Sequence, residues 1–354
     1  YGFFKNRNQV INGVKIIRAL LLPRGKGSGL KLFLNYYSWA FFASLKAYRL
    51  AKNYKFDAII VHEPSPIMQF YPALVVKRIQ KTPIYFWVMD LWPESLKIAG
   101  GVKNRMILNY FSGVIKKFYK ESEKILITSK GFKHSILEKG NFIDKIEYFP
   151  NWAEDSISRG DLNFPIPELP EGFKIIFAGN IGEAQDMESI MQTALLLKEY
   201  KKIKILLIGD GRKMPFVHGF IEEHELQDTV FTYGRFPVDA MNTFFDRAEL
   251  LLVSLKDDPI FNLTVPAKVQ AYMASGKPIL AMLNGEGAEI INDSDCGFTV
   301  PASDSRKLAE MIINASNLSP IVLKSKGVNG KVFYENNFRM ETCISNLENI
   351  LYRK

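Results

Sequence analysis

The segment PAKVQAYMASGKPILAM, residues 266–282, sets the pattern that the rest of the chain follows. Pro266 stands where a short helix can begin, Gly276 stands where it can end, and the apolar run 279–282 follows at once as a strand. The first turn of such a helix offers free N–H groups to a phosphate, and Lys268 lies in that turn. Taken alone, the segment fits an ordinary helix-to-strand junction better than a binding site. Whether it binds a ligand therefore has to be judged together with the other segments.

The same alternation of apolar β-forming runs and helical segments extends along the whole chain, which predicts an α/β fold with parallel sheets. A Pro-rich stretch, 161–172, is typical of a linker between two domains. We therefore expect one lobe at 1–160, a second lobe at 173–335 and a C-terminal helix, 336–354, that packs back on the first lobe. The expected strands are 58–61, 84–88, 124–128 and 146–149 in the first lobe, and 173–178, 204–208, 230–233, 250–255, 278–282 and 297–300 in the second.

The chain has 354 residues, of which 47% are apolar, and this is enough to form two cores. Its net charge of +9 is unevenly distributed. Residues 1–150 contain 25 lysines and arginines against 9 acidic residues, whereas the remainder contains 21 against 28. The first lobe is therefore expected to meet an anionic partner. Because no nucleic-acid recognition motif accompanies the charge, we expect a membrane surface and no nucleic acid. The two cysteines, Cys296 and Cys343, show no metal spacing and indicate reduced thiols in a cytosolic protein.

Residues 32–45 are uncharged and rich in aromatic side chains. As a helix they would extend about 21 Å, which is short of the ~30 Å hydrocarbon core of a bilayer. The segment therefore cannot cross a membrane. With basic residues at both ends, it could lie in a membrane interface or line an apolar groove, or it could be an ordinary packed helix.

Candidate ligand-binding residues follow the expected strands of the second lobe, where ligands of open parallel sheets collect. Glycines there allow close approach of a ligand, although βα turns also use glycine for purely steric reasons. Adjacent cations could neutralise a diphosphate or be a solvated pair, and an aromatic residue could meet a nucleobase or be part of a plain loop. The candidates are Gly179, Asn180, Ile181 and Gly182 after the first strand, Gly209, Asp210, Gly211, Arg212 and Lys213 after the second, and Arg235 and Phe236 after the third.

Acidic and aromatic residues follow two strands of the first lobe. Glu63 ends one strand, and Asp90, Trp92 and Glu94 follow the next. Carboxylates hydrogen-bond sugar hydroxyls, and an indole ring can stack on a sugar face. Asp90 could instead cap the following helix, which is an equally good interpretation of that residue alone.

Six motifs together resemble the family 4 glycosyltransferases, and more narrowly the WbuB-type bacterial enzymes that build O-antigen or capsule. These motifs are DLWPES (90–95), FPNW (149–152), FAGNIGEAQD (177–186), IGDGRK (208–213), VPAKVQAYMASGKPI (265–279) and NGEGAEII (284–291). The resemblance implies a GT-B fold, in which two Rossmann-like lobes face a cleft. It also implies a nucleotide diphospho-sugar donor in the second lobe, an acceptor in the first lobe, and transfer with retention of anomeric configuration. Neither a metal nor another cofactor is implied.

The chain departs from the family pattern at three places. The first strand and Gly-rich loop of the family would precede Tyr1, so we expect an N-terminal segment to be missing. Two glutamates of the wider family correspond to Leu263 and Ala271, so the ribose contact is expected from Gln270 or Glu286. The family's basic pair after the first strand of the second lobe is also replaced, with Asn180 and Gln185 in that stretch.

The resemblance and the residues together give these expectations. Lys268 and Arg212, helped by backbone N–H groups of residues 179–182, stabilise the leaving diphosphate, and Asp90 orients the acceptor hydroxyl with Glu63 as the alternate. Pro266 and Asn151 are expected to join the donor-binding residues, and Glu63, Trp92 and Glu94 to bind the acceptor. The expected donor is a nucleotide diphospho-sugar, UDP-linked, carrying an N-acetylated amino or deoxyamino sugar. The expected acceptor is a polyprenyl-diphosphate-linked saccharide, and the expected location is the cytoplasmic face of the cell membrane.

Two other functions remain open at this stage. A nucleotide-sugar epimerase of the same architecture would bind the donor but need more acid and base groups facing it. A membrane-associated scaffold without catalysis would fit the missing glutamates. A reaction with donor alone separates the epimerase from the transferase.

Overall fold

The computed structural model describes residues 8–25, 29–98, 101–154, 157 and 162–352. The chain divides into two compact units, each with its own sheet. Unit 1 contains Tyr1–Thr128 and Phe132–Phe149, and unit 2 contains Ser129–Gly131 and Pro150–Lys354. Each unit is described by itself.

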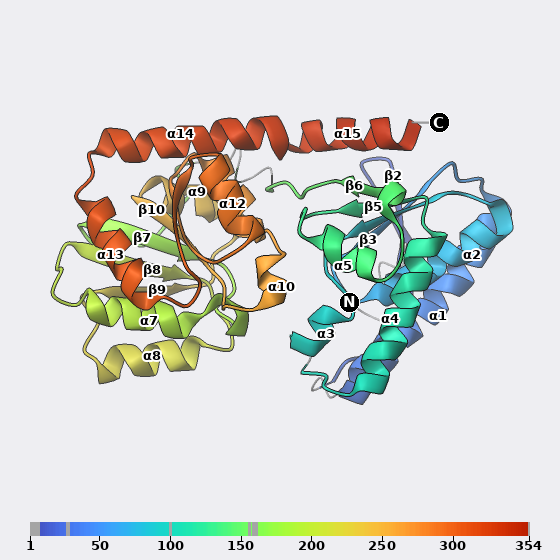
Figure 1. The fold of residues 1–354 in the computed structure, drawn as a ribbon, viewed down its shortest axis with the longest axis horizontal. Helices are drawn as coiled ribbons and strands as arrows, with labels where there is room; N and C mark the ends of the chain where they lie inside the picture. The colour runs from blue at the N-terminus through green and yellow to red at the C-terminus, as the bar shows by residue number, and fades with distance from the viewer. Residues whose placement is uncertain (1–7, 26–28, 99–100, 155–156, 158–161, 353–354) are drawn as a thin grey trace. The chain divides into compact units, whose positions relative to one another are not determined.

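Unit 1 is built on a parallel four-stranded sheet in the order β3-β4-β5-β6 (Figure 1). An antiparallel hairpin, β1-β2, precedes this sheet in the sequence and forms a separate two-stranded sheet. Its strands are β1 (Asn8–Ile11), β2 (Val14–Ile17), β3 (Ile59–Glu63), β4 (Ile84–Val88), β5 (Lys124–Ile127) and β6 (Ile146–Tyr148). Its helices are α1 (Gly29–Asn53), η1 (Ile67–Phe70), α2 (Tyr71–Gln80), α3 (Glu94–Ile98), α4 (Arg105–Glu121), α5 (Phe132–Glu138) and η2 (Ile143–Lys145).

Aromatic side chains form much of the core of unit 1. Phe70 of η1 stacks on Phe118 of α4 with ring centroids 4.5 Å apart, and meets Phe86 of β4 edge-on at 4.8 Å. α4 begins where the Asn104 side chain accepts hydrogen bonds from Met106 N and Ile107 N. This cap satisfies N–H groups that the first turn leaves free, and fixes where the helix starts.

Unit 2 contains a parallel six-stranded sheet in the order β12-β11-β10-β7-β8-β9. Its strands are β7 (Phe173–Ala178), β8 (Ile203–Ile208), β9 (Val230–Gly234), β10 (Leu250–Ser254), β11 (Ile279–Met282) and β12 (Gly297–Val300). Its helices are η3 (Glu183–Gln185), α7 (Met187–Leu196), α8 (Met214–Glu223), η4 (Val238–Ala240), α9 (Met241–Asp246), α10 (Pro259–Asn262), α11 (Ala267–Ser275), α12 (Glu286–Asp293), α13 (Ser305–Ser316), α14 (Pro320–Asn337) and α15 (Met340–Tyr352).

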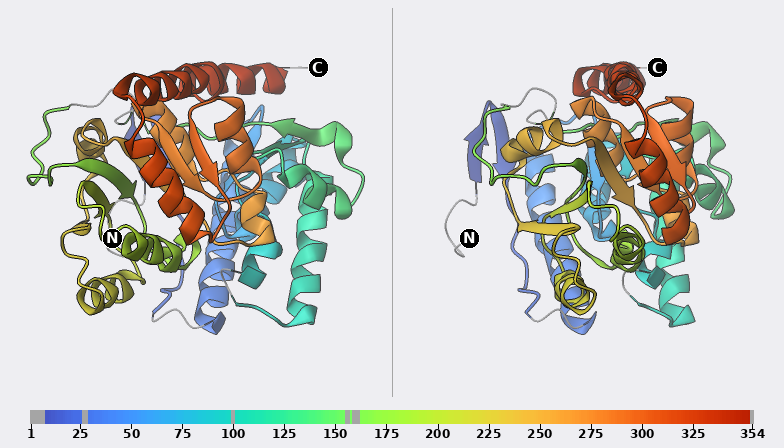
Figure 2. Two further views of the ribbon diagram at one scale, coloured as in Figure 1. Left: turned by 60° about the vertical axis from the view of Figure 1, so that its left-hand side comes forward. Right: turned by 90° about the vertical axis from the view of Figure 1, so that its left-hand side faces the viewer.

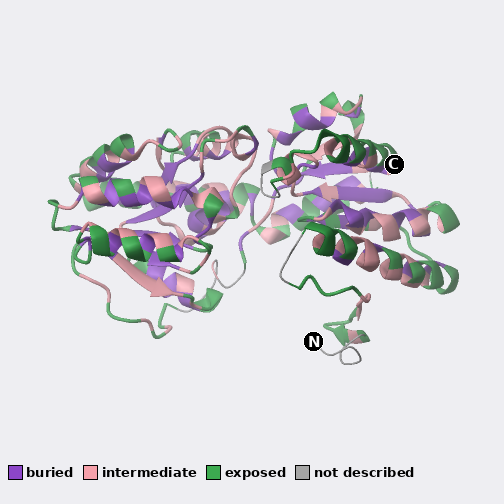
Figure 3. Ribbon diagram, turned by 90° about the horizontal axis from the view of Figure 1, so that it is seen from below, coloured by how far each residue is buried: buried purple, intermediate pink, exposed green. Residues whose placement is uncertain are grey.

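Each face of this sheet has its own apolar core. Ile175 and Phe177 of β7 pack with α7, α8 and α13, whereas Ile176 and Ala178, on the opposite face, pack with α9, α11, α12 and α14. The result is three layers, helices on both faces of a buried sheet, as Figures 2 and 3 show. Strands buried on both faces explain the unbroken apolar runs in the sequence. β8 lies on one side of β7 and β10 on the other, so the strand order reverses there, and ligands of such sheets collect at that edge.

The α/β fold with parallel sheets is confirmed, and every expected strand is present to within two residues. The hairpin β1-β2 was not expected. The units divide between Phe149 and Pro150, and Phe164, Ile166 and Leu169 of the expected linker pack on the core of unit 2. α15 is grouped with unit 2, so the packing of the C-terminal helix on the first lobe stays a prediction.

Candidate functional site

Unit 2 has a cavity of about 490 Å³ at the carboxyl ends of β7, β8 and β9 and the beginning of α11. This is the edge of the sheet at which the sequence predicted a ligand. Seven of the predicted residues line it: Gly179, Asn180, Gly209, Asp210, Arg235, Phe236 and Lys268.

Lys268 is the cation at the centre of the arrangement. Its Nζ lies 4.3 Å from the centroid of the Phe177 ring. Gly179, with φ +131°, makes room for it, since a Cβ at that position would lie 2.9 Å from Lys268 Cε. Among the described residues no carboxylate forms an ion pair with Lys268, and burial lowers its pKa to about 8. Lys268 is half-buried, and withdrawing an ammonium group from water without a counter-ion costs free energy that an anion in the cavity would offset.

The helix carrying Lys268 has the predicted boundaries. Pro266 is the N-cap of α11, with no side-chain hydrogen bond to the first turn, and Gly276 ends the helix in the left-handed conformation at φ +71°. The first N–H groups of α11 therefore have no side-chain cap. Together with Lys268 they form a positive end at the cavity, which suits phosphate oxygens.

The glycine turns act chiefly as packing surfaces. A Cβ on Gly209 would overlap the carbonyl oxygen of Gly179, and one on Gly211 would overlap that of Ile181. The two turns are also joined by hydrogen bonds, because Gly179 N donates to Ile208 O at 2.8 Å and Ile181 N donates to Asp210 O at 3.0 Å. These N–H groups are therefore occupied, and the prediction that they hold the diphosphate is wrong for Gly179 and Ile181. Ile181 is fully buried, so its predicted ligand contact is also wrong.

The cations near the turns have different positions from those predicted. Arg235 lines the cavity, with its Nε 3.2 Å from Asp210 Oδ2. Arg212 is exposed and is not among the lining residues, so the structure does not bring it to the cavity. Lys213 pairs with Glu188 at 2.6 Å and Glu183 at 3.1 Å, so its charge is already neutralised.

The remaining predicted donor residues lie outside the cavity lining. Gln270 is 2% exposed and points into the core, because α11 turns that position away from Lys268. Glu286 begins α12, and burial and the neighbouring Glu289 raise the pKa of its carboxyl group. Gly182 packs against Asn180 and Gln185, and Asn151 is half-buried; neither lines the cavity.

Several lining residues were not predicted. Tyr272, one turn after Lys268, accepts a hydrogen bond from Ala178 N at 3.1 Å and donates to Leu252 O at 3.3 Å, which ties α11 to β7 and β10. Its i, i+4 spacing from Lys268 was a usable signal. Glu154 and the apolar side chains of Met241 and Phe245 come from distant segments, and no local motif marks them.

In unit 1, the predicted acids gather at the carboxyl ends of β3 and β4. Met89 N donates to Glu63 O at 3.2 Å, which joins the two turns. Burial raises the pKa of Asp90 to about 6, opposed by hydrogen bonds from Ser95, Leu91 and Ser65. Glu94 accepts from Ser135 Oγ at 2.9 Å and pairs with Lys139 at 2.5 Å. Asp90 is therefore a half-buried carboxyl with a pKa of about 6, whereas the Glu94 side chain is held in place by Ser135 and Lys139.

Two of the predicted acceptor residues are buried. Glu63 is 0% exposed, and burial, followed by the charge of Asp90, raises the pKa of its carboxyl well above the usual range. Trp92 is 2% exposed and packs edge-on against Phe111 at 5.4 Å. Direct contact of either with an acceptor is therefore a wrong prediction, because the core already covers both side chains.

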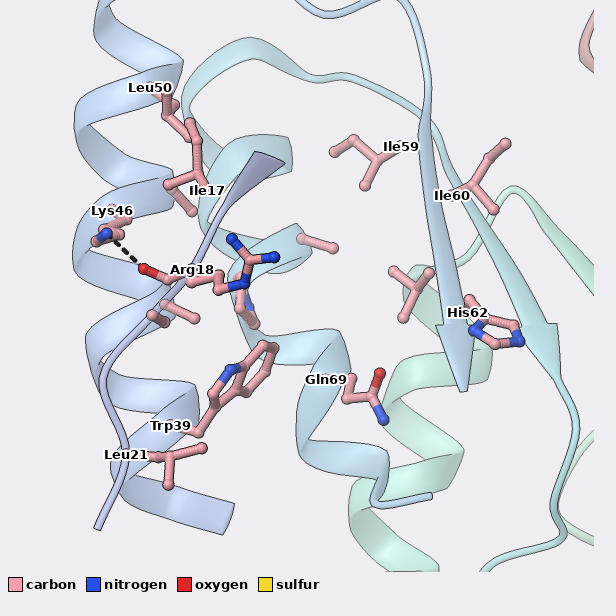
Figure 4. Close-up of a pocket in the computed structure, with 16 residues that line it drawn as sticks. Ile17, Arg18, Leu21, Trp39, Lys46, Leu50, Ile59, Ile60, His62 and Gln69 are labelled. Carbon is pink, nitrogen blue, oxygen red and sulfur yellow. Dashed lines mark hydrogen bonds between the residues drawn. The ribbon is translucent and has the colours of Figure 1, made fainter. Parts of the chain in front are cut away.

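A second cavity in unit 1, of about 710 Å³, runs along the edge strand β3 between α1 and α2 (Figure 4). Its walls are mostly aliphatic, and its polar groups include Arg18, His62 and Lys46, whose Nζ donates to Arg18 O at 2.5 Å. None of the predicted site residues lines it. In the described part of the chain β3 pairs only with β4, and an unpaired strand edge accepts another strand more readily than a small ligand. We assign no substrate to this cavity.

Comparisons with known proteins address the same regions. Residues 172–317 match the family described as glycosyl transferases group 1. The chain is 30% identical over 245 residues to the probable glycosyltransferase WbjE of Pseudomonas aeruginosa, covering 64% of this chain and 58% of that protein. It is 20% identical over 240 residues to the putative colanic acid biosynthesis glycosyltransferase WcaL of Escherichia coli, covering 64% and 56%. The chain thus spans less than two thirds of either relative.

Among solved structures, the chain resembles Anabaena HepE in complex with UDP and glucose, with a TM-score of 0.66 and 14% identity over 88% of this chain and 81% of that one. At this identity the likeness shows the fold alone. The GT-B fold expected from the motifs is therefore confirmed.

Proposed function

Because residues 172–317 form a domain of the glycosyl transferases group 1 family, we propose that this chain transfers a sugar from a nucleotide diphospho-sugar in bacterial polysaccharide biosynthesis. The observation that carries the proposal is Lys268, a half-buried cation that has no ion-pair partner among the described residues. It lies at the end of a 490 Å³ cavity on the ligand-binding edge of the sheet. A diphosphate supplies the charge that this arrangement lacks.

In the proposed reaction, the acceptor hydroxyl oxygen forms a bond to the anomeric carbon while the bond from that carbon to the diphosphate oxygen breaks. The electron pair of the broken bond stays on the diphosphate, and the hydroxyl proton passes to the departing phosphate. The new bond forms on the face that the diphosphate leaves, so configuration is retained. Lys268 and the first turn of α11 stabilise the charge that grows on the leaving group, which lowers the barrier more than it strengthens donor binding.

The rest of the cavity suits the nucleoside. Phe236 presents an aromatic ring, and the carboxylates that line the cavity are Glu154 and Asp210, of which Asp210 is paired with Arg235. We infer that Glu154 takes the ribose-binding role that was predicted for Gln270 or Glu286. UDP is the proposed nucleotide, supported by its presence in the HepE complex, and an N-acetylated amino or deoxyamino sugar is the proposed group transferred.

Asp90 is the proposed group that orients the acceptor hydroxyl. Its pKa of about 6 leaves it mostly ionised at neutral pH, so it can accept a hydrogen bond from the hydroxyl. The proposed acceptor is a polyprenyl-diphosphate-linked saccharide. The positive charge of residues 1–150 supports binding of the protein to an anionic membrane surface, and we propose that it binds on the cytoplasmic side.

The epimerase and scaffold alternatives make different demands on the cavity. An epimerase needs acid and base groups facing the sugar, but the carboxylates that line the described cavity are only Glu154 and the ion-paired Asp210. A scaffold without catalysis does not need a half-buried lysine that has no ion-pair partner among the described residues. Both features favour the transferase.

The test is a thermal-shift screen of the whole chain against nucleotides and nucleotide sugars, followed by product analysis with the ligand that binds. A ligand bound only by the folded state raises the melting temperature, by RT ln(1 + [L]/Kd) in free energy. We expect UDP and UDP-sugars to raise it and Lys268→Met to abolish the rise. No response to any nucleoside diphosphate rejects the proposal, and conversion of the donor alone to an epimer assigns the epimerase instead.

A further inference from the structure

One side of α1 carries a stripe of apolar and aromatic side chains that the described residues leave exposed. Leu30 is 71% exposed, Leu34 44%, Phe41 61%, Leu45 49% and Tyr48 45%. Their spacing of four, seven, four and three residues places them on one side of the helix. Other positions, Ala40, Ala47 and Ala51, are buried, with Ala47 and Ala51 packed against Val76 of α2. The stripe is therefore not the face that α1 uses to fold.

The beginning of α4 extends this surface. The Tyr37 hydroxyl lies 3.1 Å from the Tyr110 hydroxyl, which brings α1 and α4 together (Figure 1). Met106, at 78% exposed, Ile107, at 43%, and Tyr110, at 52%, are on this part of α4. We call the exposed stripe of α1, together with Met106, Ile107 and Tyr110, the α1–α4 face. An exposed apolar surface of this extent marks an interaction site.

The charges around the face are almost all positive. α1 contains Lys31, Arg49 and Lys52, as well as Lys46, whose ammonium is bound to Arg18 O in the β3 cavity, and it contains no acidic residue. α4 contains Arg105, Lys116, Lys117 and Lys120, and its single acid, Glu121, is its last residue. Protein–protein interfaces are depleted in lysine, whereas helices that lie in a membrane interface combine aromatic and aliphatic side chains with lysine and arginine. The charge thus favours an anionic bilayer over a protein partner.

No helix in the described ranges is both long and apolar enough to cross a membrane. An attachment through α1 must therefore lie along the surface.

We propose that the α1–α4 face docks this protein on an anionic bilayer, with the apolar stripe of α1 in the boundary between headgroups and acyl chains and the flanking lysines and arginines on the lipid phosphates. This inference deepens the membrane association in the proposed function and rests on it only for its biological purpose. The surface would bind lipid whether or not Lys268 binds a nucleotide.

The first experiment is flotation of the whole chain with vesicles of phosphatidylcholine, with and without phosphatidylglycerol. The wild type is expected to float with the anionic vesicles, and binding should weaken as salt rises. The double variant Leu34→Ser, Phe41→Ser should lower the partition coefficient roughly tenfold or more, because two apolar side chains leave the lipid. The double variant Lys116→Gln, Lys117→Gln should lower it about fivefold per lysine at low salt and flatten the salt dependence.

The matched control is Ile321→Ser, Val328→Ser on α14, two side chains that are 79% and 51% exposed and lie outside the face. Vesicle binding of this control should equal that of the wild type. Circular dichroism and the UDP-induced thermal shift should be unchanged in all three variants, which separates a loss of docking from a loss of fold or of nucleotide binding.

A second experiment measures how deeply α1 enters the bilayer. Both native cysteines, Cys296 and Cys343, are buried, so a dye should label a new thiol in Phe41→Cys selectively. Its emission should shift to the blue on anionic vesicles and be quenched by lipids spin-labelled near the headgroup, whereas a dye at Val328→Cys should show neither effect.

Three results would overturn the inference. The first is that the wild type fails to bind anionic vesicles at low salt. The second is that Leu34→Ser, Phe41→Ser binds them like the wild type. The third is that the wild type forms a concentration-dependent dimer that this double variant abolishes, since a second copy would then cover the face.

Discussion

At the scale of single residues, Lys268 is expected to cost the unliganded protein stability. Burial lowers its pKa to about 8, so below that pH the folded state holds a proton that it binds less tightly than the unfolded state does. Wild-type stability should therefore rise with pH from about 8 to about 10.4, the range over which the unfolded lysine still holds its proton. Lys268→Met removes the charge at equal length. We predict that it raises the free energy of unfolding at pH 7 by on the order of 2 kcal/mol, and that the gain shrinks toward pH 10.

Urea denaturation of both proteins between pH 7 and 10 measures this effect. A variant less stable than the wild type at pH 7 would show that Lys268 has a structural partner and is not reserved for a ligand.

The contribution of Glu63 to folding stability changes with pH in the opposite direction. Burial and the charge of Asp90 raise the pKa of Glu63, so the folded state keeps a proton that the unfolded state releases above about pH 4.3. This contribution to stability is complete at acidic pH and is lost as pH rises toward the folded pKa. Asp90, whose pKa is about 6, also makes the folded state less stable as pH rises, over a lower pH range than Glu63. Tyr119 and Glu94 are the other ionisable groups of this cluster.

Glu63→Gln keeps the shape and removes the titration. We predict that the variant gains stability relative to the wild type as pH rises from 5 to 8, in denaturant titrations at each pH. A difference that does not change with pH would mean that Glu63 is ionised in the fold.

The residue scale is also where sequence reasoning was least accurate. Lys268 was found because its position in the first helical turn is a local property. Arg212, Gln270 and Trp92 were misplaced because their exposure depends on which face of a turn or helix the remaining chain covers. Glu154 was missed because residues distant in sequence bring it to the cavity.

At the scale of elements, the turns after β7 and β8 are predicted to need glycine for packing. Gly209 has φ +136°, and a Cβ there would overlap the carbonyl oxygen of Gly179. Gly209→Ala should therefore destabilise unit 2 by about 3 kcal/mol or more and move the turn that lines the cavity, which weakens UDP binding. Gly219→Ala in α8 is the matched control, because a Cβ there meets open space and alanine favours a helix by roughly 0.5–1 kcal/mol.

Thermal melts with and without UDP measure both variants. A Gly209→Ala protein as stable as the wild type, with unchanged UDP binding, would contradict the packing role of these turns.

Elements were predicted well where the pattern is local and strong. The buried strands of both sheets are unbroken apolar runs, and α11 has a proline at one end and a glycine at the other. The hairpin β1-β2 was missed because its strands have four residues each and are mostly exposed, so no apolar alternation marks them. The short helices η3 and η4 have too few residues for a periodic signal.

At the scale of the whole molecule, the two units are expected to bind different partners. Residues 1–150, with 25 basic against 9 acidic residues, contain the face that we expect to meet lipid, and unit 2 contains the cavity with the uncompensated lysine. The charge division was visible in the sequence because composition needs no fold. The apolar stripe of α1 was left open between a groove and a core helix, and only the packed structure shows that this side is exposed.

The measurement that tests the account most directly is calorimetric titration of UDP into the whole chain and into Lys268→Met, at pH 7 and pH 9. The wild type should bind at pH 7 and bind several-fold to tenfold more weakly at pH 9, because Lys268 loses its proton near pH 8 while the terminal phosphate, with a pKa of about 6, is ionised at both. The variant should bind weakly at both pH values. Equal affinity of the two proteins at pH 7 would contradict the claim that Lys268 holds the diphosphate.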